Sequence, residues 1–373
     1  QLLKYAIYHS NLFEDLGFKY LGPIDGHNLD ELTEALMVAK MMQRPCLVHI
    51  YTKKGKGYAP AEDNSGEYHG LPPKKDDDNN CKGECFTDAF GKALLSFADN
   101  NNRIYAVTAA MKYGTGLQHF YKAFPERFFD VGIAEQHAVT FSAGLASQGK
   151  LPVFAVYSSF LQRSYDQLIH DCAIEKRHIV LGIDRAGFVG EDGETHHGLF
   201  DVAMLTTVPG VTVYSPSDTA ELLQCLEQAL YKDKGVVAVR YPRGCELYRS
   251  GTKAYSDFRH VSNKSRKLIF TYGRISAYAY TIHGADILQA IKIFPIADEI
   301  INICLAYDEI YAFEEGEREG GIAQKLCTAL ALAGFKGRFT ITAVDGFVRH
   351  SDVATQLHNA MLDADGMRKI TGE

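Results

Sequence analysis

The chain has 373 residues, 46% of them hydrophobic and 23% charged, and a formal net charge of -7 at pH 7. This is enough apolar material for two or three cores, and the acidic balance argues against a general binder of nucleic acid or of anionic membranes. No apolar run approaches the roughly 18 residues that a membrane-spanning helix needs, and no secretory signal pattern opens the sequence. We therefore expect a globular, cytoplasmic protein without a nucleic-acid or membrane partner.

The first block, residues 1–58, combines two helical patterns with two strand patterns. Residues 11–18 and 28–42 have helical spacing, with Asn28 as the expected N-cap, and YLGPIDG and PCLVHIYT have the character of strands. A sheet of two strands cannot cover its own apolar faces. The block is therefore predicted to be the C-terminal remnant of a first domain whose beginning is absent.

The rest of the chain alternates between polar stretches and α/β patterns. Residues 59–80 carry paired prolines and opposed charge runs, which predict a linker. Between 81 and 245, helical patterns alternate with nearly continuous apolar strands, as in a mostly parallel sheet covered on both faces. After a second polar linker, 246–266, the alternation resumes over 267–373. The predicted fold is α/β, with consecutive three-layer α/β/α domains and mostly parallel sheets.

The eight cysteines are scattered along the chain, and only Cys81 and Cys85 lie close together, in CKGEC. This spacing matches neither a CxxC redox pair nor a four-ligand zinc set. Free thiols in a reducing compartment are the expected state of the cysteines.

Ligands of open α/β sheets bind beyond the carboxyl ends of the strands, and three loops in such positions each carry an arginine. These are Arg163 after LPVFAVY, Arg185 after HIVLGID and Arg243 after VVAVRY. If the three converge, they form a pocket for a phosphate or carboxylate, because the guanidinium fork bonds such oxygens in pairs. Taken singly, each arginine is equally compatible with an ordinary surface position.

The loop 184–198 adds acid-base groups, with Asp192, His196 and His197 among four glycines. A metal site is a competing interpretation of DGETHHG, but adjacent histidines point apart and the sequence offers no evident third ligand. We therefore predict no metal ligand in this loop.

The run DVGIAEQHAVTFSAGLA, residues 130–146, places the carboxylate of Glu135 among small and apolar residues. Burial of a charged carboxylate is costly unless it is paired or holds a proton. Two interpretations follow: Glu135 points from a helix end into water, or it has a chemical role inside the protein.

Seven segments resemble the 1-deoxy-D-xylulose-5-phosphate synthase family, a thiamine-diphosphate-dependent branch of the transketolase superfamily. In chain order they are GPIDGHN, TKKGKGYAPAE, DVGIAEQHAVTFSAGLA, YSSFLQRSYDQ, DRAGFVGEDGETHHGLFD, SPSD and RYPRG. The pairing of DRAG with DGxTHxG, and of YSSFLQR with YDQ, distinguishes this family from transketolase proper and from the β subunits of 2-oxoacid dehydrogenases. The resemblance runs over nearly the whole chain and implies a transketolase-like fold.

The resemblance also implies roles for matching residues. Glu135 would hydrogen-bond the aminopyrimidine of thiamine diphosphate and, with His27 and His196, would be catalytic. The matches to further cofactor contacts are Phe160, Ile133, Met111 and Arg163. The matches to substrate contacts are Tyr157, Arg185, Asp192, His196 and Arg243. Core packing remains the alternative for Phe160, Ile133 and Met111, and a structural role remains the alternative for His27.

One feature of the superfamily is missing. Its members hold the diphosphate through Mg²⁺ bound by a GDG motif and a later asparagine, and this chain contains no such pair. We therefore predict that the Mg²⁺ ligands are absent from this chain. One hypothesis is a homodimeric enzyme, or the larger part of one, that acts on pyruvate and glyceraldehyde 3-phosphate. The other is a catalytically inert fragment of that enzyme, or another member of the superfamily.

Overall fold

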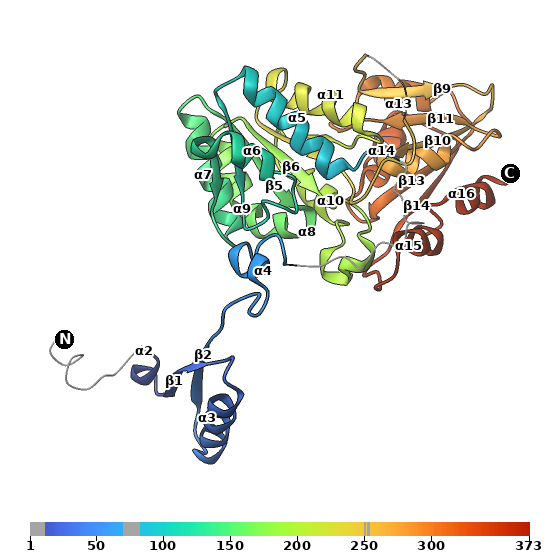
Figure 1. Ribbon diagram of the computed structural model, residues 1–373. Coiled ribbons are helices and arrows are strands. Elements are labelled where there is room, and N and C mark those ends of the chain that lie inside the picture. The colour runs from blue at the N-terminus through green and yellow to red at the C-terminus, as the bar shows by residue number, and fades with distance from the viewer. Residues whose placement is uncertain (1–11, 70–82, 250, 252–253) are drawn as a thin grey trace. The chain divides into compact units, whose positions relative to one another are not determined.

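The computed structural model describes residues 12–69, 83–249, 251 and 254–373 (Figure 1). The chain divides into two units, residues 1–78 and 79–373, and each is described by itself. A search of the described helices found none with the length and apolar character required to cross a membrane.

The first unit contains a two-stranded parallel sheet with a connecting helix. Its elements are α2 (Leu12–Asp15), β1 (Lys19–Asp25), α3 (Leu29–Met41), β2 (Cys46–Tyr51) and α4 (Ala59–Asp63). Helix α3 begins where the sequence predicts, because the Asn28 side chain accepts a hydrogen bond from the Glu31 N–H at 3.3 Å. Helix α4 lies in the stretch predicted as the first linker, and residues 70–80 of that linker are outside the described residues.

A seven-stranded sheet forms the centre of the first part of the second unit. In spatial order its strands are β12 (Lys292–Phe294), β7 (Thr212–Tyr214), β8 (Val236–Arg240), β6 (Ile179–Asp184), β5 (Leu151–Tyr157), β3 (Ile104–Thr108) and β4 (Phe128–Asp130). All neighbours are parallel except β12 and β7. The helices of this part are α5 (Phe86–Asn100), α6 (Gln118–Ala123), α7 (Glu135–Ser147), α8 (Ser158–Leu161), α9 (Tyr165–Gln167), α10 (Asp201–Leu205) and α11 (Thr219–Tyr231).

The side chains of β5 show how the layers are built. Val153 and Ala155 belong to the core that includes α5 and α11, whereas Phe154 and Val156 belong to the core that includes α7. This alternation follows from the two-residue period of a strand. Both faces of the sheet are therefore covered by helices, as Figure 1 shows, and the predicted parallel sheet is confirmed.

The second part of this unit contains a five-stranded sheet. Its strands, in spatial order, are β14 (Arg338–Val344), β13 (Glu309–Glu317), β10 (Lys267–Tyr272), β11 (Asp286–Ala290) and β9 (Phe258–Val261). Only the β9 pairing with β11 is antiparallel among these described strands. The helices here are α12 (Ser276–Ala279), α13 (Asp298–Cys304), α14 (Ile322–Leu332), α15 (Val353–Asn359) and α16 (Ala364–Thr371).

The predicted α/β fold class, with mostly parallel sheets between helices, is therefore confirmed. Two local differences stand beside it. Strand β9 lies inside residues 246–266, which were predicted to be an irregular linker, and β12 leaves the second part of the unit to pair with β7. The predicted domain boundaries themselves stay predictions.

The cysteines depart in one place from the expectation of free thiols. Those that are free are Cys46, Cys172, Cys225, Cys304 and Cys327. Cys245 is disulfide-bonded, so the expectation is wrong for that residue.

Candidate active site

The candidate site lies where three neighbouring parallel strands end. Strand β5 ends at Tyr157, β6 ends at Asp184, and β8 ends at Arg240. Because β5, β6 and β8 are adjacent and parallel, the loops that follow them begin at the same edge of the sheet. Arg185 is the first residue of one loop, and Arg243 lies three residues into another.

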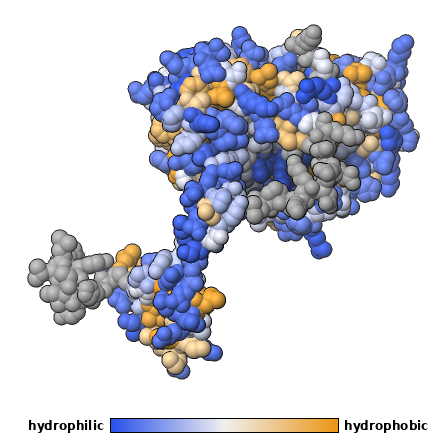
Figure 2. Space-filling model, in the orientation of Figure 1, coloured by the Kyte–Doolittle hydropathy of each residue, from blue (hydrophilic) through white to orange (hydrophobic). Residues whose placement is uncertain are grey.

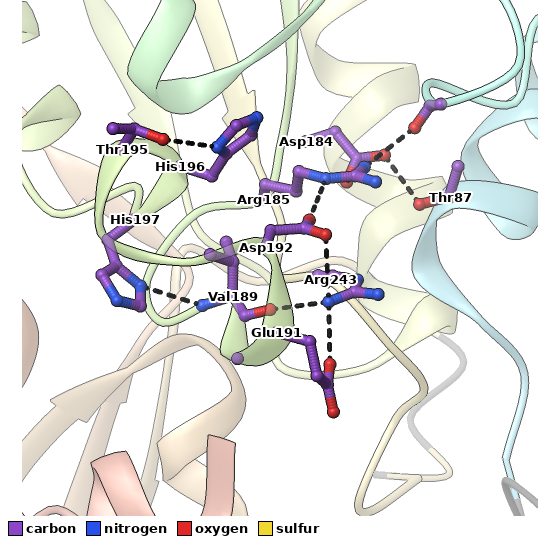
Figure 3. Close-up of polar contacts among 12 residues, drawn as sticks. Thr87, Asp184, Arg185, Val189, Glu191, Asp192, Thr195, His196, His197 and Arg243 are labelled. Carbon is purple, nitrogen blue, oxygen red and sulfur yellow. Dashed lines mark hydrogen bonds and ion pairs between the residues drawn. The ribbon is translucent and has the colours of Figure 1, made fainter. Parts of the chain in front are cut away.

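Arg185 and Arg243 meet around one carboxylate, that of Asp192 (Figure 3). Arg185 Nε donates to Asp192 Oδ2 at 2.9 Å, and an Arg243 guanidinium nitrogen lies 3.3 Å from Asp192 Oδ1. The same Arg243 nitrogen donates to the Val189 carbonyl at 2.7 Å and to Glu191 Oε2 at 3.1 Å. Two guanidinium groups thus share an oxyanion that the protein itself supplies.

The position of Arg185 is fixed by contacts on its other sides. Its guanidinium carbon lies 3.7 Å from the centroid of the Tyr157 ring, and its Nη1 donates to the Gly114 carbonyl at 3.1 Å. A Cβ added at Gly114 would come within 1.7 Å of the Tyr157 hydroxyl oxygen, so this approach requires glycine. Arg185 has φ +63°, a strained conformation for a residue with a side chain, of the kind found at functional sites.

Asp184, directly before Arg185, is fully buried and accepts a hydrogen bond from Thr87 Oγ1 at 2.7 Å. Burial raises the pKa of this carboxyl to about 6, although the Arg185 guanidinium and the Thr87 hydroxyl act in the opposite direction. Burial also raises the pKa of the nearby Tyr157 hydroxyl, against the influence of Arg185. Near pH 6 and below, Asp184 therefore brings less negative charge to the site than an exposed aspartate would.

Aromatic side chains continue the site away from the arginines. The Tyr157 and Phe160 rings are stacked with centroids 5.7 Å apart, and the His196 ring meets Phe160 edge-on at 5.2 Å. His196 Nδ1 and the Thr195 hydroxyl are 2.9 Å apart. Tyr157, Phe160 and His196 are thus brought together, as their matches to one family site imply.

The two adjacent histidines point away from each other (Figure 3). His197 is buried, its Nδ1 accepts a hydrogen bond from the Val189 N–H at 3.2 Å, and burial lowers its pKa. Within the described part of the chain, no group of three or more His, Cys, Asp or Glu side chains could hold a metal ion. The metal interpretation of DGETHHG therefore has no support in this geometry.

Glu135, the first residue of α7, is 1% exposed, so the interpretation that it points into water is wrong. Its Oε2 lies 3.0 Å from an Arg163 guanidinium nitrogen but accepts no well-directed hydrogen bond from any described residue. Arg163 therefore does not join Arg185 and Arg243 at Asp192 but pairs with Glu135. A buried carboxylate oxygen that accepts no hydrogen bond within the protein can accept a hydrogen bond from a bound cofactor.

Three other predicted residues lie in different surroundings. Met111 is buried in the core that includes α7, whereas Ile133, two residues before that helix, is 75% exposed. His27 belongs to the first unit, where its Nε2 accepts a hydrogen bond from the Lys53 N–H at 2.8 Å.

The sequence did not identify Gly114, which accepts a hydrogen bond from Arg185, or Val189 and Glu191, which accept hydrogen bonds from Arg243. Glu191 carried one usable signal, since it lies beside Asp192 in the same loop. Gly114 and Val189 contribute carbonyl oxygens, which no residue type reveals.

Two family profiles match the chain. One, described as transketolase, pyrimidine binding domain, covers residues 85–246, and one described as 1-deoxy-D-xylulose-5-phosphate synthase covers residues 1–52. The first profile contains Arg185, Arg243 and the Asp192 carboxylate that they share, which together we call the arginine cluster.

Curated relatives extend the similarity over nearly the whole chain. The 1-deoxy-D-xylulose-5-phosphate synthase of Thermomicrobium roseum is 52% identical over 99% of this chain and 61% of its own length. That of Clostridium acetobutylicum is 39% identical over 98% of this chain and 62% of its own length. The chain thus spans less than two thirds of either relative.

Solved structures support the fold. A chain of a split-gene transketolase, described as an inactive beta4 tetramer, has a TM-score of 0.68 at 23% identity and covers 78% of this chain and 98% of its own length. Transketolase from Campylobacter jejuni has a TM-score of 0.64 at 14% identity over 99% of this chain and 70% of its own. At these identities the likeness concerns the transketolase-like fold alone.

Proposed function

Because the chain belongs to the 1-deoxy-D-xylulose-5-phosphate synthase family, we propose that it forms part of a transferase that decarboxylates pyruvate and passes two carbons to glyceraldehyde 3-phosphate. The family implies thiamine diphosphate, which when bound supplies an electron sink for such chemistry. In our proposal this chain provides the side that meets the cofactor's aminopyrimidine and the site that binds the acceptor's phosphate.

The arginine cluster is the observation that carries the proposal. Asp192 already places a carboxylate between Arg185 and Arg243, so the spacing of the two guanidinium groups suits an oxyanion. The Arg243 side chain keeps 36% of its surface exposed, which leaves it accessible to a phosphate that displaces Asp192 and Glu191.

Glu135 supports the assignment of the cofactor. Its buried Oε2 lacks a hydrogen-bond donor among the described residues, and a protonated ring nitrogen of the aminopyrimidine would supply one. We propose that Glu135 holds the proton at that nitrogen and that Arg163 keeps the carboxylate oriented at 3.0 Å. Phe160, three residues before Arg163, would pack on the ring.

The described residues offer no metal site, so we propose that the Mg²⁺ ligands lie in the part of the relatives that this chain does not span. The isolated chain is then expected to bind thiamine diphosphate weakly, in keeping with the alternative of an inert fragment. A homodimer and a cytoplasmic location stay predictions from the sequence, as does a catalytic role for His27 and His196.

The proposal is tested by Arg243→Ala in a preparation that includes the missing part of the enzyme. The Michaelis constant for glyceraldehyde 3-phosphate should rise by an amount equivalent to about 2 to 4 kcal/mol, since a charge-assisted contact is lost. Pyruvate decarboxylation without the acceptor should remain nearly unchanged, because that step never meets the phosphate. Arg243→Lys should recover part of the loss, since a point charge replaces a planar fork.

Equal damage to the constants for both substrates would mean that Arg243 supports the sheet edge and would contradict the phosphate assignment. Turnover by this chain alone, with cofactor and Mg²⁺ supplied, would contradict the proposal that further polypeptide completes the site.

A further inference from the structure

A buried ion pair between Arg274 and Glu315 lies next to the loops of the candidate site. Arg274 belongs to the 3-10 turn η6 (Gly273–Ile275) that follows β10, and Glu315 lies on the neighbouring strand β13. Their side chains are 6% and 7% exposed. Arg274 Nε donates to Glu315 Oε2 at 2.9 Å, and Arg274 Nη2 donates to Glu315 Oε1, so the pair is bidentate.

The remaining hydrogen bonds of this pair reach the two loops that carry the arginine cluster. Arg274 Nη2 donates to the Phe188 carbonyl at 2.8 Å, and its Nη1 donates to the Arg243 carbonyl at 3.3 Å. Glu315 Oε1 accepts a hydrogen bond from the Phe188 N–H at 2.7 Å. One ion pair thus holds the backbone of the loop after β6 and that of the loop after β8.

Gly187 shows how close this approach is. A Cβ added there would lie 2.4 Å from Glu315 Oε1, and Gly187 has φ +84°. Glycine is therefore required for the loop after β6 to reach the carboxylate.

We propose that Arg274 and Glu315 are positioning residues for the acceptor-phosphate site, because they set the distance between Arg243 and the loop that holds Asp192. This inference rests on the proposed function. The Arg243 side chain donates to the carbonyl of Val189, the neighbour of Phe188. Because Arg274 binds the backbone carbonyls of both Arg243 and Phe188, the same ion pair holds the two segments that this contact joins. Small displacements of the groups that bind a ligand cause large losses of affinity or of reaction rate.

The most informative variant is Arg274→Lys. It preserves the buried charge opposite Glu315, but an ammonium cannot serve the carboxylate and two carbonyls in the planar geometry of a guanidinium. A second variant, Glu315→Gln, keeps an oxygen for the Phe188 N–H while it removes the charge. It tests the same idea if the lysine variant does not fold.

Arg259→Lys is the matched control. Arg259 NH2, on β9, lies 2.8 Å from Glu221 Oε1 on α11, and the two side chains are 16% and 1% exposed. This pair also joins the two parts of the second unit, but Glu221 accepts its further hydrogen bonds from Ser217 and Gln289 rather than from the site loops. A general loss of packing between the parts should therefore appear in this control as well.

The experiment is a titration of this chain with glycerol 3-phosphate, an unreactive phosphate-bearing analogue of the acceptor, followed by NMR, with the melting temperature measured in parallel. Arg274→Lys should weaken binding roughly tenfold to a hundredfold, while Arg259→Lys binds as the wild type does at a similar loss of melting temperature. In the completed enzyme, Arg274→Lys should raise the Michaelis constant for glyceraldehyde 3-phosphate but not that for pyruvate.

Wild-type affinity in folded Arg274→Lys or Glu315→Gln would overturn the inference while the phosphate site stands. An equal loss in Arg259→Lys would overturn it too, since the effect would then be general. If the wild type fails to bind the analogue, or if Arg243→Ala binds it as tightly as the wild type does, the phosphate site itself is wrong, and the inference falls with it.

Discussion

The first unit and the second unit use the same kinds of element but differ in what those elements bury. In the second unit, β5, β6 and β8 are buried almost throughout. Among the described residues of the first unit, Ala61 alone is buried, and all thirteen residues of α3 are exposed or half-buried. Figure 2 shows hydrophobic residues at the surface of the first unit, where the most exposed large side chains of α3 are Leu29, Leu36, Met37 and Met41.

This difference shows that helical and strand patterns of apolar residues are not sufficient to form a buried core. Parallel strands need helices on both faces, and the described residues of the first unit provide two strands and one long helix. Its apolar side chains follow the helical period, yet they meet no second layer among the described residues of that unit. The second unit has that layer, because α5 and α11 cover one face of its large sheet and α7 covers the other.

Hydrogen exchange on the intact chain offers the strongest test of this comparison. Amides of β1, β2 and α3 should be protected roughly a thousandfold less than those of β5 and β6, because local opening of the first unit exposes little new apolar surface. Mass spectrometry of peptides from both units gives the two values in one sample. Similar protection in both units would mean that the first unit has a core we have not recognised.

Single core substitutions should show the same contrast on a smaller scale. Phe154 is fully buried in β5, so Phe154→Ala should lower the free energy of unfolding by about 3 to 5 kcal/mol. Leu36, 51% exposed on α3, is the matched control, and Leu36→Ala should change the free energy of unfolding by less than about 0.5 kcal/mol. Urea unfolding of each variant checks both values, and equal costs would contradict the comparison.

The apolar runs LPVFAVY, HIVLGID and VVAVRY predicted β5, β6 and β8, whereas no local pattern was assigned to β9 or β11. Strand β11 contains Asp286 and Gln289, both buried. Asp286 accepts a hydrogen bond from the Asn263 N–H at 2.8 Å, and Gln289 donates to Ser217 at 3.0 Å. Only the folded chain brings these partners together, so no local pattern could reveal the strand. Strand β9, with the sequence FRHV, lacked a pattern because it is a half-exposed edge strand.

The candidate site, like the strands, was predictable from the sequence only in part. The strand-end rule brought Arg185 and Arg243 to one edge, because it depends only on the order of parallel strands. The rule was too coarse for Arg163, which lies on the turn η2 (Gln162–Ser164) and pairs with Glu135. The Gly114 carbonyl reaches Arg185 across 71 positions of sequence, a contact that strand order does not specify.

The smallest predicted effect concerns pH and again separates the units. Burial raises the pKa of Asp184 to about 6 in the folded second unit, above the value of about 3.9 expected for an unfolded chain. The folded state therefore binds this proton more tightly, and its stability should fall as the pH rises from about 4 to about 6. Asp184→Asn cannot release the proton, so the stability of the wild type relative to this variant should decrease by about 1 to 3 kcal/mol between pH 4 and pH 7.

Urea unfolding at four or five pH values measures this change, and Glu34→Gln on the exposed surface of α3 is the control. Glu34→Gln removes a carboxylate from the first unit. The difference in unfolding free energy between the wild type and this variant should change by less than about 0.5 kcal/mol between pH 4 and pH 7. If Asp184→Asn and the wild type kept a constant difference across this range, Asp184 would be ionised throughout. The second unit buries this ionisable group, whereas no charged residue is buried among the described residues of the first unit. That contrast would then have no consequence for the pH dependence of stability.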